Sequence, residues 1–208
     1  MDIEQAAPPI AGLILAGGRS SRMGGIEKSR ICLDGTPLVY KIAVLLESLF
    51  SEVILITNQP NLHEDLPPGV MIAPDFHRGR GPLGGLHAGL RRIQAQAVFC
   101  VACDMPSLRR DLIEAQLQSF RAAYARGCQI LIPRIGRLIE PLHGIYVKTV
   151  EPAVDRICRG RGGYSIRILL QQVRTCYWDL EDTAENRSAF FNLNTPKDLR
   201  VHLEASGE

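Results

Sequence analysis

Apolar residues along the chain fall into two kinds of block. The first kind is a short continuous run rich in branched side chains, which is typical of a strand covered on both faces of a sheet. The second kind places apolar residues three or four positions apart, which is the spacing of one face of an amphipathic helix. Strand-like runs occur at residues 13–16, 53–58, 70–73, 97–102, 129–133 and 175–180, and helical faces at residues 38–49, 86–93, 112–124, 150–158 and 166–173.

The alternation of these blocks favours one architecture. Parallel strands joined by helices form a doubly wound sheet, whose ligands collect at the carboxyl ends of the strands. No repeat, low-complexity tract or linker interrupts the alternation. The sequence therefore predicts an α/β fold, with a single-domain, doubly wound and mostly parallel sheet over residues 1–208.

Composition narrows the class of protein. The 208 residues are 46% hydrophobic and 22% charged, and the formal net charge is only +2, so nothing favours a nucleic-acid or membrane-surface partner. No apolar run approaches the roughly 20 residues of a membrane helix, and residues 1–9 lack the basic and apolar stretches of a secretory signal. We therefore expect a cytoplasmic protein, with a disordered segment at residues 1–9.

The first strand leads into a loop rich in glycine and basic residues. Residues 17–28 read GGRSSRMGGIEK. Glycine permits positive φ and close approach, so that backbone N–H groups can point at an anion, and Arg19, Arg22 and Lys28 add positive charge. The glycines match neither the spacing of a P-loop nor that of a dinucleotide-binding loop. We predict a phosphate-binding loop; the alternative is an ordinary strand-to-helix turn with surface arginines.

A second loop, PDFHRGRGPLGG at residues 74–85, follows the strand-like run at 70–73. Pro82 can open a helix, which would turn the N–H groups of the first helical turn toward a ligand. Asp75 is a candidate ligand contact, and a carboxylate that caps a surface turn is the alternative. His77 and His87 are interpreted as a loop residue and a helix-surface residue, with no metal partner at helical spacing.

Asp104 lies two residues after the apolar run at residues 97–102. A carboxylate at the end of a central strand is well placed to hold Mg²⁺, which takes one or two protein carboxylates together with phosphate oxygens. Helix capping or a turn is the alternative. Together with the two glycine-rich loops, this position favours a metal site.

Four segments, in one order, resemble those of the molybdenum cofactor guanylyltransferases, which belong to the enzymes that transfer a nucleoside monophosphate from a triphosphate. The resemblance covers Leu13 to Leu199 and implies a Rossmann-like nucleotidyltransferase fold. It also implies a nucleotide-binding part at residues 10–107 and an acceptor-binding part at residues 108–204. The four segments are LAGGRSSRMGGIEK at residues 15–28, GPLGG at 81–85, CDMP at 103–106 and NLNTP at 192–196.

The chain departs from the family pattern at three positions. Glu27 stands where the family often has Asp, which keeps the charge. Ile56 stands where Asn is common, so one polar contact to the nucleotide is missing or replaced. Glu140 stands where His is common, which leaves the role of that position open.

The resemblance implies a role for each segment. Asp75 would accept hydrogen bonds from the two donors that guanine presents and adenine lacks. Asp104 would bind the metal, Mg²⁺ or alternatively Mn²⁺, and Asn192 and Asn194 would line the acceptor side. The implied catalytic residues are Arg22, Lys28 and Asp104, and the implied GTP-binding residues are Leu15, Ala16, Gly17, Gly18, Lys28, Asp75, Gly81, Pro82, Leu83 and Asp104.

The implied reaction is transfer of GMP from GTP to the terminal phosphate of molybdopterin, with release of pyrophosphate. The partners would be GTP, molybdopterin and, transiently, the molybdoenzymes or chaperones that receive the cofactor. Two alternatives stay open: a relative that uses CTP or another phosphate acceptor, and an inactive GTP-binding adaptor that delivers the cofactor. A dinucleotide-dependent oxidoreductase is disfavoured because the loop lacks the Gly-x-Gly-x-x-Gly spacing.

Overall fold

The structure is a computed structural model, and it describes residues 7–17 and 30–206 of the chain. Gly18, Arg22 and Lys28, which the sequence places in the phosphate loop, lie outside the described residues. The carbonyl of Pro9 accepts backbone hydrogen bonds from Gln96 and Ala97. None of the helices in the described ranges has the length and apolar character that crossing a bilayer requires.

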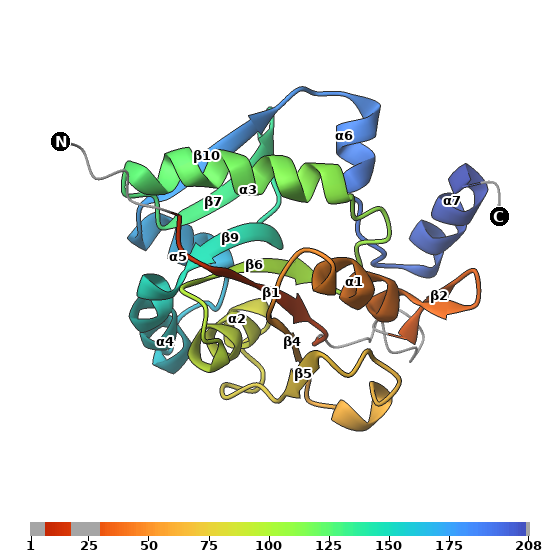
Figure 1. Ribbon diagram of the computed structural model, residues 1–208, viewed down its shortest axis with the longest axis horizontal. Helices are drawn as coiled ribbons and strands as arrows, with labels where there is room; N and C mark the ends of the chain where they lie inside the picture. Colours follow the sequence, from red (N-terminus) through yellow and green to blue (C-terminus); the bar gives the residue numbers. More distant parts are fainter. Residues whose placement is uncertain (1–6, 18–29, 207–208) are drawn as a thin grey trace.

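A mixed, mostly parallel sheet runs through the molecule (Figure 1). Its strand order is β10-β7-β9-β6-β1-β4-β5, with β8 paired to β7. Among the strands of this sheet in residues 7–17 and 30–206, only β9 and β8 run antiparallel to their neighbours, so the predicted doubly wound, mostly parallel architecture is confirmed. The strands are β1 (Ile10–Leu15), β4 (Val53–Ile56), β5 (Val70–Ala73), β6 (Ala97–Ala102), β7 (Ile130–Ile135), β8 (Leu138–Ile139), β9 (His143–Val147) and β10 (Thr175–Leu180).

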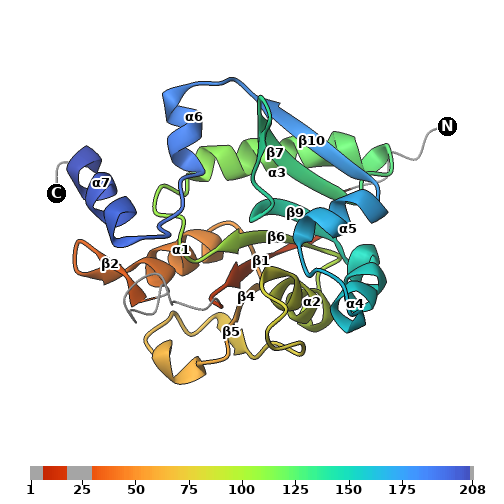
Figure 2. The ribbon, with the colours of Figure 1, turned by 180° about the vertical axis from the view of Figure 1, so that it is seen from behind.

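Helices cover both faces of this sheet. Alternate residues of β1 point to opposite faces, so Ile14 packs with α1 and α3, whereas Leu13 and Leu15 pack with α2, α4 and α5. Figure 1 shows α1 and α3 in front of the sheet, and Figure 2, from behind, shows α2, α4 and α5. The helices are α1 (Leu38–Glu47), α2 (Pro82–Arg92), α3 (Arg110–Ala125), α4 (Glu151–Arg159), α5 (Ile166–Gln172), α6 (Ala184–Ala189) and α7 (Pro196–Ser206).

Smaller elements complete the described chain. A hairpin of β2 (Cys32–Leu33) and β3 (Thr36–Pro37) precedes α1, and two 3₁₀ turns lie at Pro60–Leu62 and Lys148–Val150. Pro82 opens α2, as predicted. The short helix α6 was not predicted, because its six residues, AENRSA, carry no apolar periodicity.

The register brings the carboxyl ends of the central parallel strands to one edge. Leu15 of β1 pairs with Ile56 of β4 on one side and with Ala102 of β6 on the other. Ile56 in turn pairs with Ala73 of β5. The residues that follow these strands therefore share the edge at which ligands bind in open α/β sheets.

Candidate functional site

A pocket of about 550 Å³ opens at this edge of the sheet. Residues 15–17 at the end of β1 and residues 56–59 at the end of β4 form one side. Asp75, Gly79, Gly81 and Pro82, from the connection between β5 and α2, form the other. The volume lies within the range of small-molecule and cofactor sites, roughly 300–1,000 Å³.

Asp75 is held against the first turn of α2. Its Oδ1 accepts a hydrogen bond from the backbone N–H of His77 at 2.7 Å. A Cβ added to Gly84 would lie 2.6 Å from Asp75 Oδ2, so this carboxylate needs the space that a glycine leaves. The positive end of the helix dipole favours a negative charge here. Gly79 and Gly81 adopt φ of +81° and +60°, a conformation that lets the loop turn beside the pocket.

The end of β4 provides a mixed wall. Thr57 is buried, and its Oγ1 accepts a hydrogen bond from the N–H of Gln59 at 3.1 Å. Asn58 is exposed and lines the pocket. Ile56, which replaces the family's common Asn, lines the pocket as an apolar side chain. The polar groups on this wall therefore come from residues 57–59.

Asp104 lies where β6 ends and is partly buried. The N–H of Cys103 donates to the carbonyl of Leu15 at 3.1 Å, which places Asp104 beside the end of β1. The N–H of Leu193 donates to the carbonyl of Asp104 at 2.8 Å, so a late segment of the chain is bound to the same point. Asp104 thus lies where the central strands meet the segment that carries Asn192 and Asn194.

A second pocket, of about 450 Å³, is lined by Glu140, Asn192 and Asn194. Glu140 Oε2 accepts a hydrogen bond from Asn192 Nδ2 at 3.2 Å, and its Oε1 accepts one from the N–H of Leu142 at 3.0 Å. Burial raises the pKa of Glu140, and the negative charge of Asp104 raises it further. Glu140, whose role the sequence left open, therefore lines the same pocket as the predicted acceptor residues Asn192 and Asn194. It is also close enough to Asp104 for that charge to affect its pKa.

Two histidines lie side by side behind the first pocket: His77 is in a loop, as predicted, whereas His87 is not where the sequence predicted it. His87 was expected on the surface of its helix, but it is buried, with 1% of its surface exposed. His77 lies beside it, with the ring centroids 4.7 Å apart. Both face Asp155 on α4. Burial lowers the pKa of His87, as does the charge of His77, while the guanidinium of Arg159 holds the pKa of Asp155 low.

The structure places the described candidate residues in two pockets and at two other positions. Six line the first pocket, and Asn192 and Asn194 line the second. Asp104 lies just after the end of β6, and Leu83 is fully buried in the apolar core instead of facing the first pocket. The six residues are Leu15, Ala16, Gly17, Asp75, Gly81 and Pro82.

Known proteins are similar to this chain over most of its length. The MobA-like NTP transferase domain matches residues 12–175. The molybdenum cofactor guanylyltransferase of Syntrophotalea carbinolica is 34% identical over 191 residues, which cover 90% of this chain and 87% of that protein. The enzyme of the same name from Vibrio atlanticus is 34% identical over 188 residues, which cover 90% and 92%.

A solved structure shows the same fold at low sequence identity. Molybdopterin-guanine dinucleotide biosynthesis protein A of Archaeoglobus fulgidus superposes with a TM-score of 0.77 at 27% identity, over 95% of this chain and 98% of that one. The sequence and fold comparisons agree over nearly the whole described chain. This protein therefore belongs to the molybdenum cofactor guanylyltransferase family of nucleotidyltransferases, within the MobA-like NTP transferase domains.

Proposed function

We propose that this nucleotidyltransferase transfers GMP from GTP to molybdopterin, releasing pyrophosphate and forming molybdopterin guanine dinucleotide. The observation that carries the proposal is the first pocket, where Asp75 is seated against the start of α2 at the carboxyl ends of the strands. A carboxylate suits guanine because the N1–H and the exocyclic amine both donate hydrogen bonds. The names of the relatives support the same reaction.

In this proposal, the base and the phosphates of GTP occupy different parts of the first pocket. Guanine would lie against Asp75, Gly81 and Pro82, and the phosphates would extend past Gly17 toward the basic loop. Arg22 and Lys28 would neutralise the triphosphate, which is a role that their residue types and positions in the sequence support.

Asp104 is the proposed ligand for Mg²⁺, with Mn²⁺ as the alternative ion. Its carboxylate is a hard oxygen donor, and its negative charge adds to burial in raising the pKa of the neighbouring Glu140. A bound divalent ion would neutralise charge on the phosphate oxygens. Asp104 would hold the ion beside the end of β1, where the triphosphate would pass.

The reaction requires little chemistry from side chains. A terminal phosphate is already ionised near neutral pH, so it can attack the α-phosphorus of GTP without a general base. A bond forms between the acceptor oxygen and the α-phosphorus, the bond to the β-phosphate oxygen breaks, and pyrophosphate leaves. Positioning and charge neutralisation by Arg22, Lys28 and Asp104 would therefore supply most of the catalysis.

The second pocket is the proposed acceptor site. The carboxylate of Glu140 and the amide of Asn192 offer hydrogen-bonding groups, and Ile139 and Phe190 offer apolar contact. A pterin has both a polar edge and flat faces, which match this lining. We propose that residues 10–107 bind the nucleotide and residues 108–204 the acceptor. Cytoplasmic location and contacts with receiving enzymes stay predictions.

The test is pyrophosphate release from purified protein with Mg²⁺ and each nucleoside triphosphate in turn, with and without molybdopterin. We expect release only with GTP and molybdopterin together. Asp104→Asn should lower kcat about 100-fold or more, because it removes charge from the metal ligand. Asp75→Asn should raise KM for GTP about 10- to 100-fold, the cost of a lost hydrogen bond to a charged group.

Asp179→Asn is the matched control, because Asp179 is an exposed carboxylate on β10 that pairs with Arg134. It should behave as the wild type. Release with CTP would show that Asp75 does not select guanine and would move the protein to a cytidylyl branch. GTP binding without any turnover would favour the inactive adaptor.

A further inference from the structure

Two histidines and two carboxylates from three separate segments meet between α2 and α4. His77 comes from the loop after β5, His87 from the middle of α2, and Glu151 and Asp155 from successive turns of α4. Asp155 Oδ1 lies 3.1 Å from His77 Nε2 and 3.3 Å from His87 Nε2. Glu151 Oε1 lies 3.0 Å from His87 Nε2.

These separations match the edges of a tetrahedral metal site. Zinc bonds to nitrogen and oxygen are about 2.0–2.2 Å long, so neighbouring ligand atoms in a tetrahedron lie about 3.3 Å apart. The ligand atoms of His77, His87 and Asp155 all lie within 4.8 Å of one another. Small side-chain movements would therefore place them around one ion.

The groups around the cluster orient its donor atoms. Arg159 Nε binds Asp155 Oδ2 at 2.8 Å, which turns Oδ1 toward both imidazoles. Outer partners of this kind commonly orient metal-binding carboxylates. The side chain of His87 is only 2% exposed, and its Nδ1 has no hydrogen-bond partner within residues 7–17 and 30–206. The polar contacts of this buried ring are therefore made by Nε2, which faces the cluster.

The donor set indicates the class of metal. Two imidazoles with one or two carboxylates suit Zn²⁺ and related first-row ions, whereas Mg²⁺ favours oxygen donors. The cluster also uses none of the residues assigned to the triphosphate. It would consequently hold a different ion from the one proposed for Asp104.

We propose that His77, His87 and Asp155, with Glu151 as the fourth ligand, bind a structural Zn²⁺. The ion would fasten the loop after β5 to α4, and this loop carries Asp75 only two residues before His77. The zinc would therefore brace one wall of the first pocket. Metal binding here does not depend on which nucleotide or acceptor the enzyme uses.

The test begins with tag-free, full-length protein stripped of metal by a chelator and dialysed. Titration with Co²⁺ should give about one ion per chain and the intense visible absorption of a tetrahedral site. Zn²⁺ should abolish that absorption by displacing Co²⁺, and an excess of Mg²⁺ should leave it unchanged. When the protein that has received Zn²⁺ is dialysed again, the zinc content measured by mass spectrometry should likewise approach one ion per chain.

Point variants tie the signal to these residues. His77→Asn and Asp155→Asn should each weaken Co²⁺ binding about 100-fold or more, since loss of a ligand exceeds the 10- to 100-fold cost of losing an outer partner. His202→Asn on α7 and Asp179→Asn on β10 are the matched controls, and both should bind as the wild type. Circular dichroism of each variant checks that it is folded.

Several results would overturn the proposal. One is the absence of stoichiometric Co²⁺ or Zn²⁺ binding by the folded wild type, which would make the cluster a hydrogen-bonded network alone. Equal loss of binding in the controls, or a weak absorption typical of six oxygen ligands, would also contradict a zinc site here. Binding that survives in both folded His77→Asn and Asp155→Asn proteins would place the ion elsewhere.

Discussion

His143 lies between the rings of Phe99 and Phe190, edge-on to both, with centroid distances of 4.9 Å. Gln116 Nε2 donates to two backbone carbonyls, so its Oε1 is left to accept the hydrogen bond from His143 Nδ1 at 2.8 Å. Burial lowers the pKa of His143 to about 4. The folded protein therefore holds this imidazole neutral where an unfolded chain would protonate it.

This shift predicts how stability changes with pH. Between pH 6.5 and about 4, His143 is protonated in the unfolded state and neutral in the folded state. The free energy of unfolding therefore falls as pH falls. The loss attributable to His143 should be about 3 kcal/mol over this window. Urea denaturation at several pH values measures it, with His143→Phe as the comparison because Phe keeps the ring contacts.

The variant should be less stable than the wild type near neutral pH, since Gln116 Oε1 loses its partner. Its stability should nevertheless fall less steeply than that of the wild type below pH 6.5. His202→Asn should retain the wild-type slope. Parallel curves for the wild type and His143→Phe would show that His143 does not set the pH dependence.

Among the elements, α2 depends on glycine for its position. A Cβ added to Gly89 would lie 2.6 Å from Leu13 Cδ2, and one added to Gly85 would lie 2.8 Å from Leu15 Cδ2. The helix backbone therefore packs directly against β1. Three glycines within a helix of 11 residues weaken its intrinsic propensity, and tertiary packing compensates.

Gly89→Ala tests this close packing. Leu13 is fully buried and has little room to move, so the helix should be pushed from the strand and the free energy of unfolding should fall by about 1–3 kcal/mol. Urea denaturation would measure the change. In Gly163→Ala, the matched control, the nearest atom to the new Cβ is Ile168 Cδ1 at 3.4 Å, so little change is expected. A neutral or stabilising Gly89→Ala would show that helix propensity outweighs the contact with Leu13.

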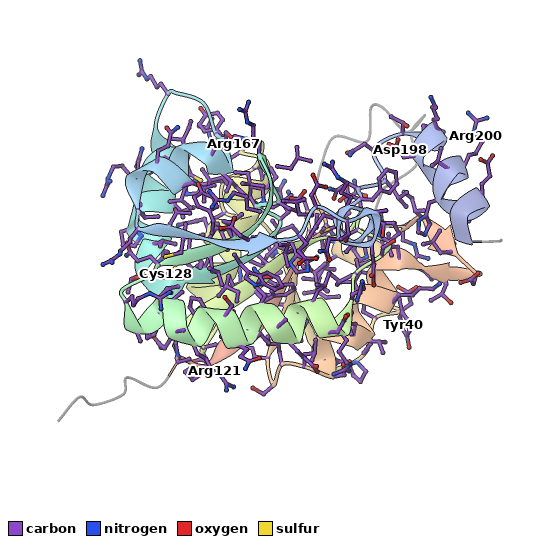
Figure 3. All side chains as sticks on the ribbon, turned by 90° about the horizontal axis from the view of Figure 1, so that it is seen from above. Tyr40, Arg121, Cys128, Arg167, Asp198 and Arg200 are labelled. Atoms are coloured by element: carbon purple, nitrogen blue, oxygen red, sulfur yellow. The ribbon has the colours of Figure 1, made fainter. Side chains whose placement is uncertain are left out.

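At the scale of the molecule, the segment before α7 joins the second pocket to the end of β6, beside β1. The contact from Leu193 N–H to the Asp104 carbonyl joins this segment to the end of β6. Asp198 Oδ2 accepts hydrogen bonds from the N–H groups of Asn194 and Thr195, and Thr195 Oγ1 accepts one from the N–H of Asp198. Such a reciprocal cap defines where α7 starts and also shapes the second pocket. Figure 3 shows Asp198 and Arg200 on α7, far from Cys128.

Asp198→Ala should separate the two proposed binding parts. Loss of the cap should lower the free energy of unfolding by about 1 kcal/mol. The substitution also removes a carboxylate that lines the second pocket. We expect a higher KM for molybdopterin and an unchanged Kd for GTP, the reverse of Asp75→Asn. Steady-state kinetics and calorimetry would measure the two quantities, with Asp179→Ala as the control. Equal weakening of GTP binding and molybdopterin binding would contradict the proposal that residues 10–107 bind the nucleotide and residues 108–204 bind the acceptor.

The sequence by itself determined the class of fold and pointed to half of the residues that line the first pocket. Continuous apolar runs and helical spacing report burial locally, so they located most of the helices and the strands β1, β4, β5, β6, β7 and β10. Residues directly after the parallel strands, such as Ala16 and Asp75, share one edge whenever neighbouring strands are in register. Their common pocket was therefore predictable from strand positions and loop chemistry.

Tertiary structure alone decided which distant side chains meet. The partners Glu140 and Asn192 are 52 residues apart, and His77 and Asp155 are 78 apart. Periodicity describes one element at a time, so it indicated neither the burial of His87 against α4 nor the antiparallel direction of β9. Leu83 shows the same limit within a motif, because helix rotation turns it into the core while Pro82 beside it lines the pocket. These contacts depend on how helices and strands pack together, which short sequence patterns do not encode.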